Sequence, residues 1–147
     1  TSRFTDRSSL NTAINAWIDD DTAATATYGN INNWDVSQIT DFSGLFQNKA
    51  TFNSDISNWD VSSGTSFETM FAGATSFNQD IGGWNVSSGT NFYGMFYEAD
   101  SFNKDIGGWD VSSGNNFYGM LSGAAGMLVL ELILEGCSLG QMHLTRI

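Results

Sequence analysis

The sequence predicts an α/β solenoid of leucine-rich-repeat type, with about four 25-residue repeats and a helical cap at the amino end. Tryptophan recurs every 25 residues, and isoleucine, valine and phenylalanine keep the same register around it without insertion or deletion. Periods of 20 to 29 residues are typical of leucine-rich repeats, in which each unit buries its apolar face by stacking on its neighbours. The recurring tryptophans are Trp34, Trp59, Trp84 and Trp109.

Residues 1–30 are predicted to form a lead-in that contains the capping helix. From Ser8 onward, apolar residues recur at the spacing of one helical face, and Ser8 or Ser9 can cap the first free amides. A solenoid needs an amphipathic cover of this kind over its first open end. The apolar stripe consists of Leu10, Ile14, Trp17 and Ile18.

Three consecutive aspartates, residues 19–21, follow this helix. Carboxylates are unfavourable at a helix carboxyl end, so we expect them to help end it. The sequence lacks the EF-hand pattern around them, which disfavours a dedicated calcium loop. Residues 23–30 are interpreted as a connection into the first repeat.

Each repeat, within residues 31–126, is predicted to hold one short strand, one short helix and a return turn. In the copy at 81–105, Trp84 and Val86 alternate with polar residues, which suits a half-buried strand. The residues that follow are spaced at i, i+3, i+4 and i+7, which indicates about two helical turns. That second set consists of Phe92, Met95, Phe96 and Ala99.

Stacked repeats place equivalent residues above one another, so every repeated position forms a ladder. We expect the tryptophans to form a buried ladder. A ladder of asparagines is expected to satisfy backbone groups of the return turns that no strand can reach. Its members are Asn53, Asn78 and Asn103.

Aspartates also recur at the repeat spacing, and stacked like charges repel. One series is unbroken, and the other, at Asp35, Asp60 and Asp110, has asparagine in place of one member. Either each carboxylate accepts amide hydrogen bonds within its own turn, or a divalent cation such as calcium lies between the rungs. The candidate metal ligands are Asp55, Asp80 and Asp105; no other cofactor is expected.

The charge balance excludes several function classes. Sixteen acidic and five basic residues give a formal net charge of −11, which argues against nucleic acid and anionic membranes as partners. Basic partners, cations and neutral glycans remain open as ligands.

The longest apolar run, 127–134, is too short to span a membrane. The single cysteine and single histidine, Cys137 and His143, form no catalytic constellation, so an enzyme is not predicted.

Residues 127–147 leave the repeat pattern, since leucines replace the expected asparagine, aspartate and tryptophan. This tail could cover the open carboxyl end of the stack. It could equally form an assembly interface or result from an altered reading frame.

The repeated motif W-D-V-S followed by F-x-x-M-F-x-x-A-x-S-F-N-x-D-I, over about residues 31–120, resembles the BspA-like or mycoplasma-lipoprotein-type surface repeat. The resemblance implies a leucine-rich-repeat-like protein at a microbial or algal cell surface or outside cells. It carries over no catalytic residue. We therefore expect a non-catalytic recognition or adhesion module for a protein or glycan ligand. The alternative is a structural subunit that self-assembles through its solenoid ends into filaments.

Overall fold

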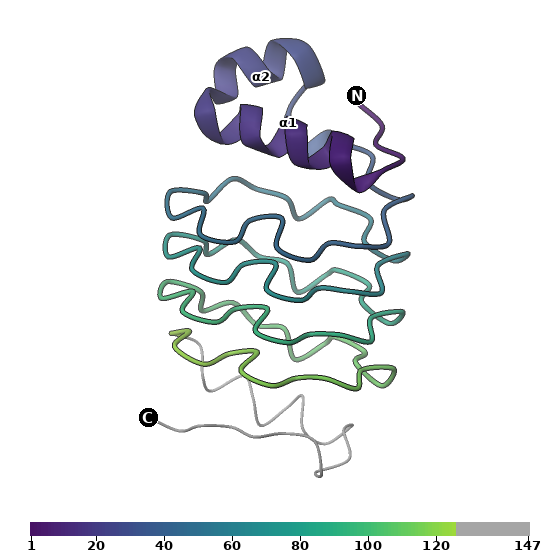
Figure 1. Ribbon diagram of the computed structural model, residues 1–147, viewed down its shortest axis with the longest axis vertical. Helices are drawn as coiled ribbons and strands as arrows, with labels where there is room; N and C mark the ends of the chain where they lie inside the picture. The colour runs from purple at the N-terminus through teal and green to yellow at the C-terminus, as the bar shows by residue number, and fades with distance from the viewer. Residues whose placement is uncertain (126–147) are drawn as a thin grey trace.

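The computed structural model describes residues 1–125. Helix α1 (Arg7–Asp19) and helix α2 (Asp21–Tyr28) come first, followed by a single 3-10 turn, η1 (Ile31–Asn33). Below the two helices the chain winds into coils that lie one beneath another (Figure 1). We number these coils by the repeat that forms each one: coil 1 is 31–55, coil 2 is 56–80, coil 3 is 81–105 and coil 4 is 106–125.

The prediction of an α/β solenoid of leucine-rich-repeat type is wrong. Within residues 1–125 there is no β-strand, and no helix follows η1. The β-type pairing between the described coils is limited to isolated parallel bridges, such as Asp41 to Ser66 and Ser66 to Asn91. Both the strand predicted around Trp84 and the helix predicted after residue 90 are therefore absent from the described coils.

A run of tight turns stands where each helix was predicted. We call this run the turn segment; it covers 42–48, 67–73, 92–98 and 117–123 in the four coils. Alternate N–H groups donate to the next coil, as from Phe92 to Asn116 O and from Gly94 to Tyr118 O, at 2.8 and 2.9 Å. The N–H groups between them donate three residues back, as from Met95 to Phe92 O at 3.2 Å. Each turn segment thus combines local turns with a parallel inter-coil ladder of hydrogen bonds.

The turn segment is not helical because its backbone reverses hand at regular intervals. Gly94 and Glu98 have φ angles of 55° and 54°, whereas an α-helix requires φ near −63°. The apolar spacing is nevertheless satisfied, because these turns return the same side chains to the interior. The four residues that suggested a helix in coil 3 are all fully buried: Phe92, Met95, Phe96 and Ala99.

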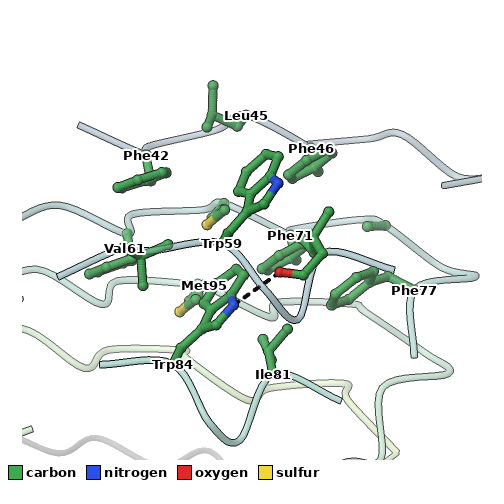
Figure 2. Packing of buried hydrophobic residues seen from close by; sticks show 14 of the residues in the cluster. Phe42, Leu45, Phe46, Trp59, Val61, Phe71, Phe77, Ile81, Trp84 and Met95 are labelled. Carbon is green, nitrogen blue, oxygen red and sulfur yellow. Dashed lines mark hydrogen bonds between the residues drawn. The ribbon is translucent and has the colours of Figure 1, made fainter. Parts of the chain in front are cut away.

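Phenylalanine ladders fill the interior of the stack. Phe71 lies between Phe46 and Phe96, with ring centroids 5.4 and 5.5 Å away and nearly parallel planes. Phe77 packs against Phe71 within coil 2, at 4.1 Å. Figure 2 shows Phe46, Phe71 and Phe77 together with Trp84, whose ring packs against Phe71. Because rings contact one another both within a coil and between neighbouring coils, the coils share one continuous core.

The tryptophan side of each coil has the predicted alternation of burial but no strand. Trp84 and Val86 are buried and Asn85 between them is exposed. Instead of a backbone ladder, the indole N–H bridges the coils. Trp84 Nε1 donates to Ile56 O of the preceding coil at 3.2 Å, the dashed line in Figure 2. The same bond recurs from Trp59 Nε1 to Ile31 O and from Trp109 Nε1 to Ile81 O.

Helix α1 lies across the first coil with its apolar face buried; the buried residues are Leu10, Ala13, Ile14 and Trp17. Its N-cap is Asp6, which accepts from Ser9 N at 2.8 Å, rather than either predicted serine. The helix ends at Asp19. Asp20 then caps α2, so interpreting residues 23–30 as a plain connection was wrong.

Arg7 occupies the upper edge of the inter-coil ladder. Its guanidinium donates to Asp41 O at 3.0 Å and also to Ser43 O. In coil 2 the corresponding carbonyls, of Ser66 and Glu68, accept from backbone N–H groups of the coil above. The fork of Arg7 therefore supplies donors that a preceding coil would have provided.

Predictions for residues 127–147, including Cys137, His143 and the proposed carboxyl-terminal cap, lie outside the described residues.

Candidate functional site

The three candidate metal ligands each serve as the acceptor of a local turn. Asp55 Oδ1 accepts from Ser57 N at 2.9 Å, Asp80 Oδ1 from Gly82 N at 3.1 Å, and Asp105 Oδ1 from Gly107 N at 2.8 Å. Among residues 1–125, no group of three or more histidine, cysteine, aspartate or glutamate side chains could hold a metal ion. The geometry therefore offers no metal site there on which to base a function.

The second aspartate series also closes local turns, with the help of serine hydroxyls. Asp110 Oδ1 accepts from Ser112 Oγ at 2.6 Å and from Ser112 N at 3.0 Å. These two bonds stabilise the charged form and hold the pKa of Asp110 below its usual range, with the hydroxyl contributing most. Asp35 has the same arrangement with Ser37 and a similarly lowered pKa. Both carboxylates are thus turn acceptors, not tuned acids or bases.

The asparagine ladder links the return turns of successive coils. Asn53 Oδ1 accepts from Asn78 N, and Asn78 Oδ1 accepts from Asn103 N, both at 2.9 Å. Gln79 Nε2 adds a bond to Asn53 O at 2.8 Å. The oxygens of Asn53 and Asn78 are engaged within the chain, so the geometry gives these side chains a structural part and leaves recognition to other residues.

A cavity of about 380 Å³ lies where the end of α1 meets the return turn of coil 1. Its walls include the acidic run 19–21, but Asp20 is engaged as the cap of α2 through Ala23 N, at 3.0 Å. Trp17 Nε1 donates to Ser54 Oγ at 2.9 Å in the same wall. The arrangement pairs no nucleophile with a base, so it does not suggest a reaction.

The most unusual surface feature is a group of tyrosines on coils 3 and 4. Tyr93, Tyr97 and Tyr118 are 38, 46 and 50% exposed, and they are the large exposed hydrophobic side chains of the described chain. All three belong to turn segments. We call this group the tyrosine face.

The rings of the tyrosine face are ordered relative to one another. Tyr93 and Tyr118 stack with centroids 5.8 Å apart and planes 11° from parallel. Tyr97 lies beside two residues that have no side chain: a β-carbon added at Gly94 would stand 3.6 Å from its Cβ, and one added at Gly119 would stand 3.9 Å from its Cδ2. A stacked pair and a third ring therefore remain accessible over a glycine-lined strip.

Only coils 3 and 4 carry this face. Along the stack, the column that includes Tyr93 and Tyr118 begins with Ser43 and Glu68. The column that includes Tyr97 is otherwise small or polar: Gln47, Ala72 and Ser122. Sequence reasoning missed the face, although Phe-Tyr-Gly recurs at 92–94 and 117–119 and was a visible signal. The departure from uniform repetition makes the tyrosine face the candidate site.

Carboxylates border the tyrosines. Glu98 follows Tyr97 in the chain, and hydrogen bonding to its carboxylate, together with the carboxylate charge, raises the pKa of Tyr97. Glu68 precedes Tyr93 in its column, and its Oε2 accepts from Asn91 Nδ2 at 3.1 Å. The tyrosine face is therefore aromatic and acidic, a composition suited to binding.

Within residues 1–125, no helix is both long enough and apolar enough to cross a membrane.

Comparison with known proteins identifies the family to which the repeats belong. No curated protein and no solved structure matches the chain. The family described as "Mycoplasma protein of unknown function, DUF285" matches residues 19–128, which include α2, all four coils and the tyrosine face. Since this match covers most of the chain, the protein belongs to that mycoplasma repeat family.

Proposed function

We propose that this protein is a non-catalytic recognition module, of the BspA-like surface type, which binds its ligand at the tyrosine face. The observation that carries the proposal is the exposure of Tyr93, Tyr97 and Tyr118 in a stack whose other phenylalanine and tryptophan rings are buried. Tyrosine supplies a large contact area at low entropic cost and retains a hydroxyl for specificity, which is why it is enriched in binding sites.

The rigidity of the stack supports a role in ligand recognition. Continuous phenylalanine ladders and inter-coil hydrogen bonds hold the tyrosine backbone at fixed spacing. A rigid scaffold reduces the entropy lost on binding. The resemblance to cell-surface repeats suggests that the ligand is a protein or glycan met at a cell surface or outside cells.

End-to-end filament assembly has no comparable support. Such assembly needs two open, complementary ends. At the amino end, α1 buries Leu10 and Ile14, and Arg7 occupies the carbonyls of the first turn segment. We therefore base the proposal on the tyrosine face rather than on the ends of the stack.

A binding survey tests this function. The full chain is applied to arrays of neutral and charged oligosaccharides and of short peptides of varied charge, beside a variant with Tyr93, Tyr97 and Tyr118 changed to serine. We expect at least one probe class to bind, and we expect the triple variant to bind it at least about tenfold more weakly. Tyrosines that become buried on binding contribute much of the binding free energy in many interfaces.

The control is Gln47→Ala, an exposed residue of coil 1 in the same column as Tyr97. It should bind as the unchanged protein does, and thermal melting should show that the triple variant is folded. Equal binding by the triple variant, or no binding to any probe, would remove the proposed function.

A further inference from the structure

The charges around the tyrosine face narrow the class of ligand. No lysine or arginine occurs between Lys49 and Lys104, a stretch that contains all of coil 2 and most of coil 3. The acidic residues of the same stretch include Glu68 and Glu98, which border the face. A surface of this sign attracts cationic partners and repels anionic ones.

The basic residues of the amino-terminal part are already engaged at the other end of the stack. Arg3 lies 3.6 Å from a carboxylate oxygen of Asp35, and Arg7 lies 3.7 Å from one of Asp41. Lys49 Nζ donates to Asn15 Oδ1 at 2.9 Å. None of these groups neutralises the carboxylates on coils 2 and 3.

The chain itself places a cation on a turn segment. The Arg7 guanidinium lies 4.0 Å from where a β-carbon at Gly44 would stand. Gly44 is the coil 1 counterpart of Gly94 and Gly119, beside which the tyrosines lie. At the open edge of the first turn segment, a guanidinium thus lies within reach of a turn-segment glycine.

We propose that the tyrosine face binds a basic peptide segment, with lysine or arginine side chains lying against the tyrosine rings and pairing with Glu68 and Glu98. This proposal rests on the recognition function above and names its ligand class. Guanidinium and ammonium groups bind over aromatic faces by cation–π attraction, and nearby carboxylates add charge-assisted hydrogen bonds. The stacked pair Tyr93–Tyr118 offers a continuous aromatic surface, and the Tyr97 ring beside Glu98 offers a second contact.

Titration of the full chain with three fluorescent peptides tests the proposal: arginine alternating with glycine, and the same sequence with glutamine or glutamate in place of arginine. A neutral β-glucan oligosaccharide serves as the non-peptide probe. We expect the arginine peptide to bind at least about tenfold more tightly than the glutamine peptide and the glutamate peptide not to bind. High salt should weaken the binding.

Variants separate this site from general attraction to an acidic protein. Tyr97→Ser, which changes no charge, should weaken binding of the arginine peptide about twofold to fivefold. Glu98→Gln should weaken it more than Asp19→Asn, which removes the same charge from an exposed position at the end of α1. Thermal melting of each variant checks the fold.

Each other outcome overturns the ligand assignment. If Asp19→Asn weakens binding as much as Glu98→Gln and Tyr97→Ser has no effect, the attraction is unspecific. Tyrosine-dependent binding of the glucan, or a tyrosine-dependent dimer in sedimentation, would replace the basic peptide with another occupant while leaving the recognition function in place. If no probe, including those of the arrays, depends on the tyrosines, both proposals fail.

Discussion

The repeated tryptophan both packs in the core and forms a hydrogen bond between coils, as Trp84 shows. The Trp84 ring packs beside Phe71, and its indole N–H reaches Ile56 O, where the main chain provides no inter-coil bond. The same carbonyl also accepts from Trp59 N at 3.1 Å. Losing the indole donor therefore removes one of two bonds rather than leaving the carbonyl without a partner.

Replacing Trp84 with phenylalanine should lower the free energy of unfolding by about 1–3 kcal/mol, because it removes this hydrogen bond and some buried volume. Alanine at the same position should cost about 3–5 kcal/mol. Denaturant unfolding monitored by circular dichroism measures both. Tyr118→Phe, at an exposed aromatic of coil 4, is the control and should change the stability by less than about 0.5 kcal/mol. If Trp84→Phe changes the free energy of unfolding as little as Tyr118→Phe does, the indole hydrogen bond does not stabilise the stack.

At the scale of elements, the sequence predicted the repeat but not the form of its units. The period and the buried set were readable because each repeated apolar position lies in the core. The spacing of Phe92, Phe96 and Ala99 suggested a helix because consecutive tight turns bring the same positions inward. The contrary signal was Gly94, at the centre of the proposed helix, whose recurrence in most repeats marks a backbone position with positive φ.

The candidate site could not be read from the repeat for a different reason. The consensus sequence of the repeat contains only the residues that all coils share. The tyrosine face exists because coils 3 and 4 differ from coils 1 and 2. Tyr97 lies beside Gly119, a residue of the next coil, and that neighbour is known only once the register of stacking is known. The acidic ladder, by contrast, was read correctly as repeated, but the sequence left open whether turns or cations engage it.

One turn-segment position offers a direct test of this backbone. Thr69 has a φ of 50°, which is unfavourable for a β-branched residue, while the equivalent positions in the other coils are Gly44, Gly94 and Gly119. Thr69→Gly should therefore raise the free energy of unfolding by about 0.5–1 kcal/mol, despite the greater freedom of glycine in the unfolded chain. The reverse change, Gly94→Ala, should lower it by about 1 kcal/mol. Urea unfolding measures the free energy of unfolding of both variants. If Thr69→Gly is less stable than the unchanged protein, the contacts of the threonine outweigh its backbone strain.

At the scale of the whole molecule, the coils form a one-dimensional array in which each unit contacts mainly its neighbours. Stability in such an array is a sum of unit and interface terms, so an uncovered end lowers the stability of every coil behind it. The amino end of the stack is covered twice. Residues 2–4 pair with Asp35 through bonds of 2.9 Å to the main chain, and α1 buries the first coil from above.

Removing residues 1–30 should therefore lower the melting temperature of the whole stack and promote self-association. The deletion uncovers Trp34, against which Trp17 packs, and it leaves Asp41 O and Ser43 O without the Arg7 donors. Scanning calorimetry and sedimentation measure the two effects. Arg7→Ala, which removes the ladder donors and the ion pair with Asp41 but leaves the rest of residues 1–30 in place, should give a smaller decrease without self-association. A truncated chain that melts unchanged and stays monomeric would show that α1 and α2 are an appendage, and that the coil stack needs no cover at its amino end.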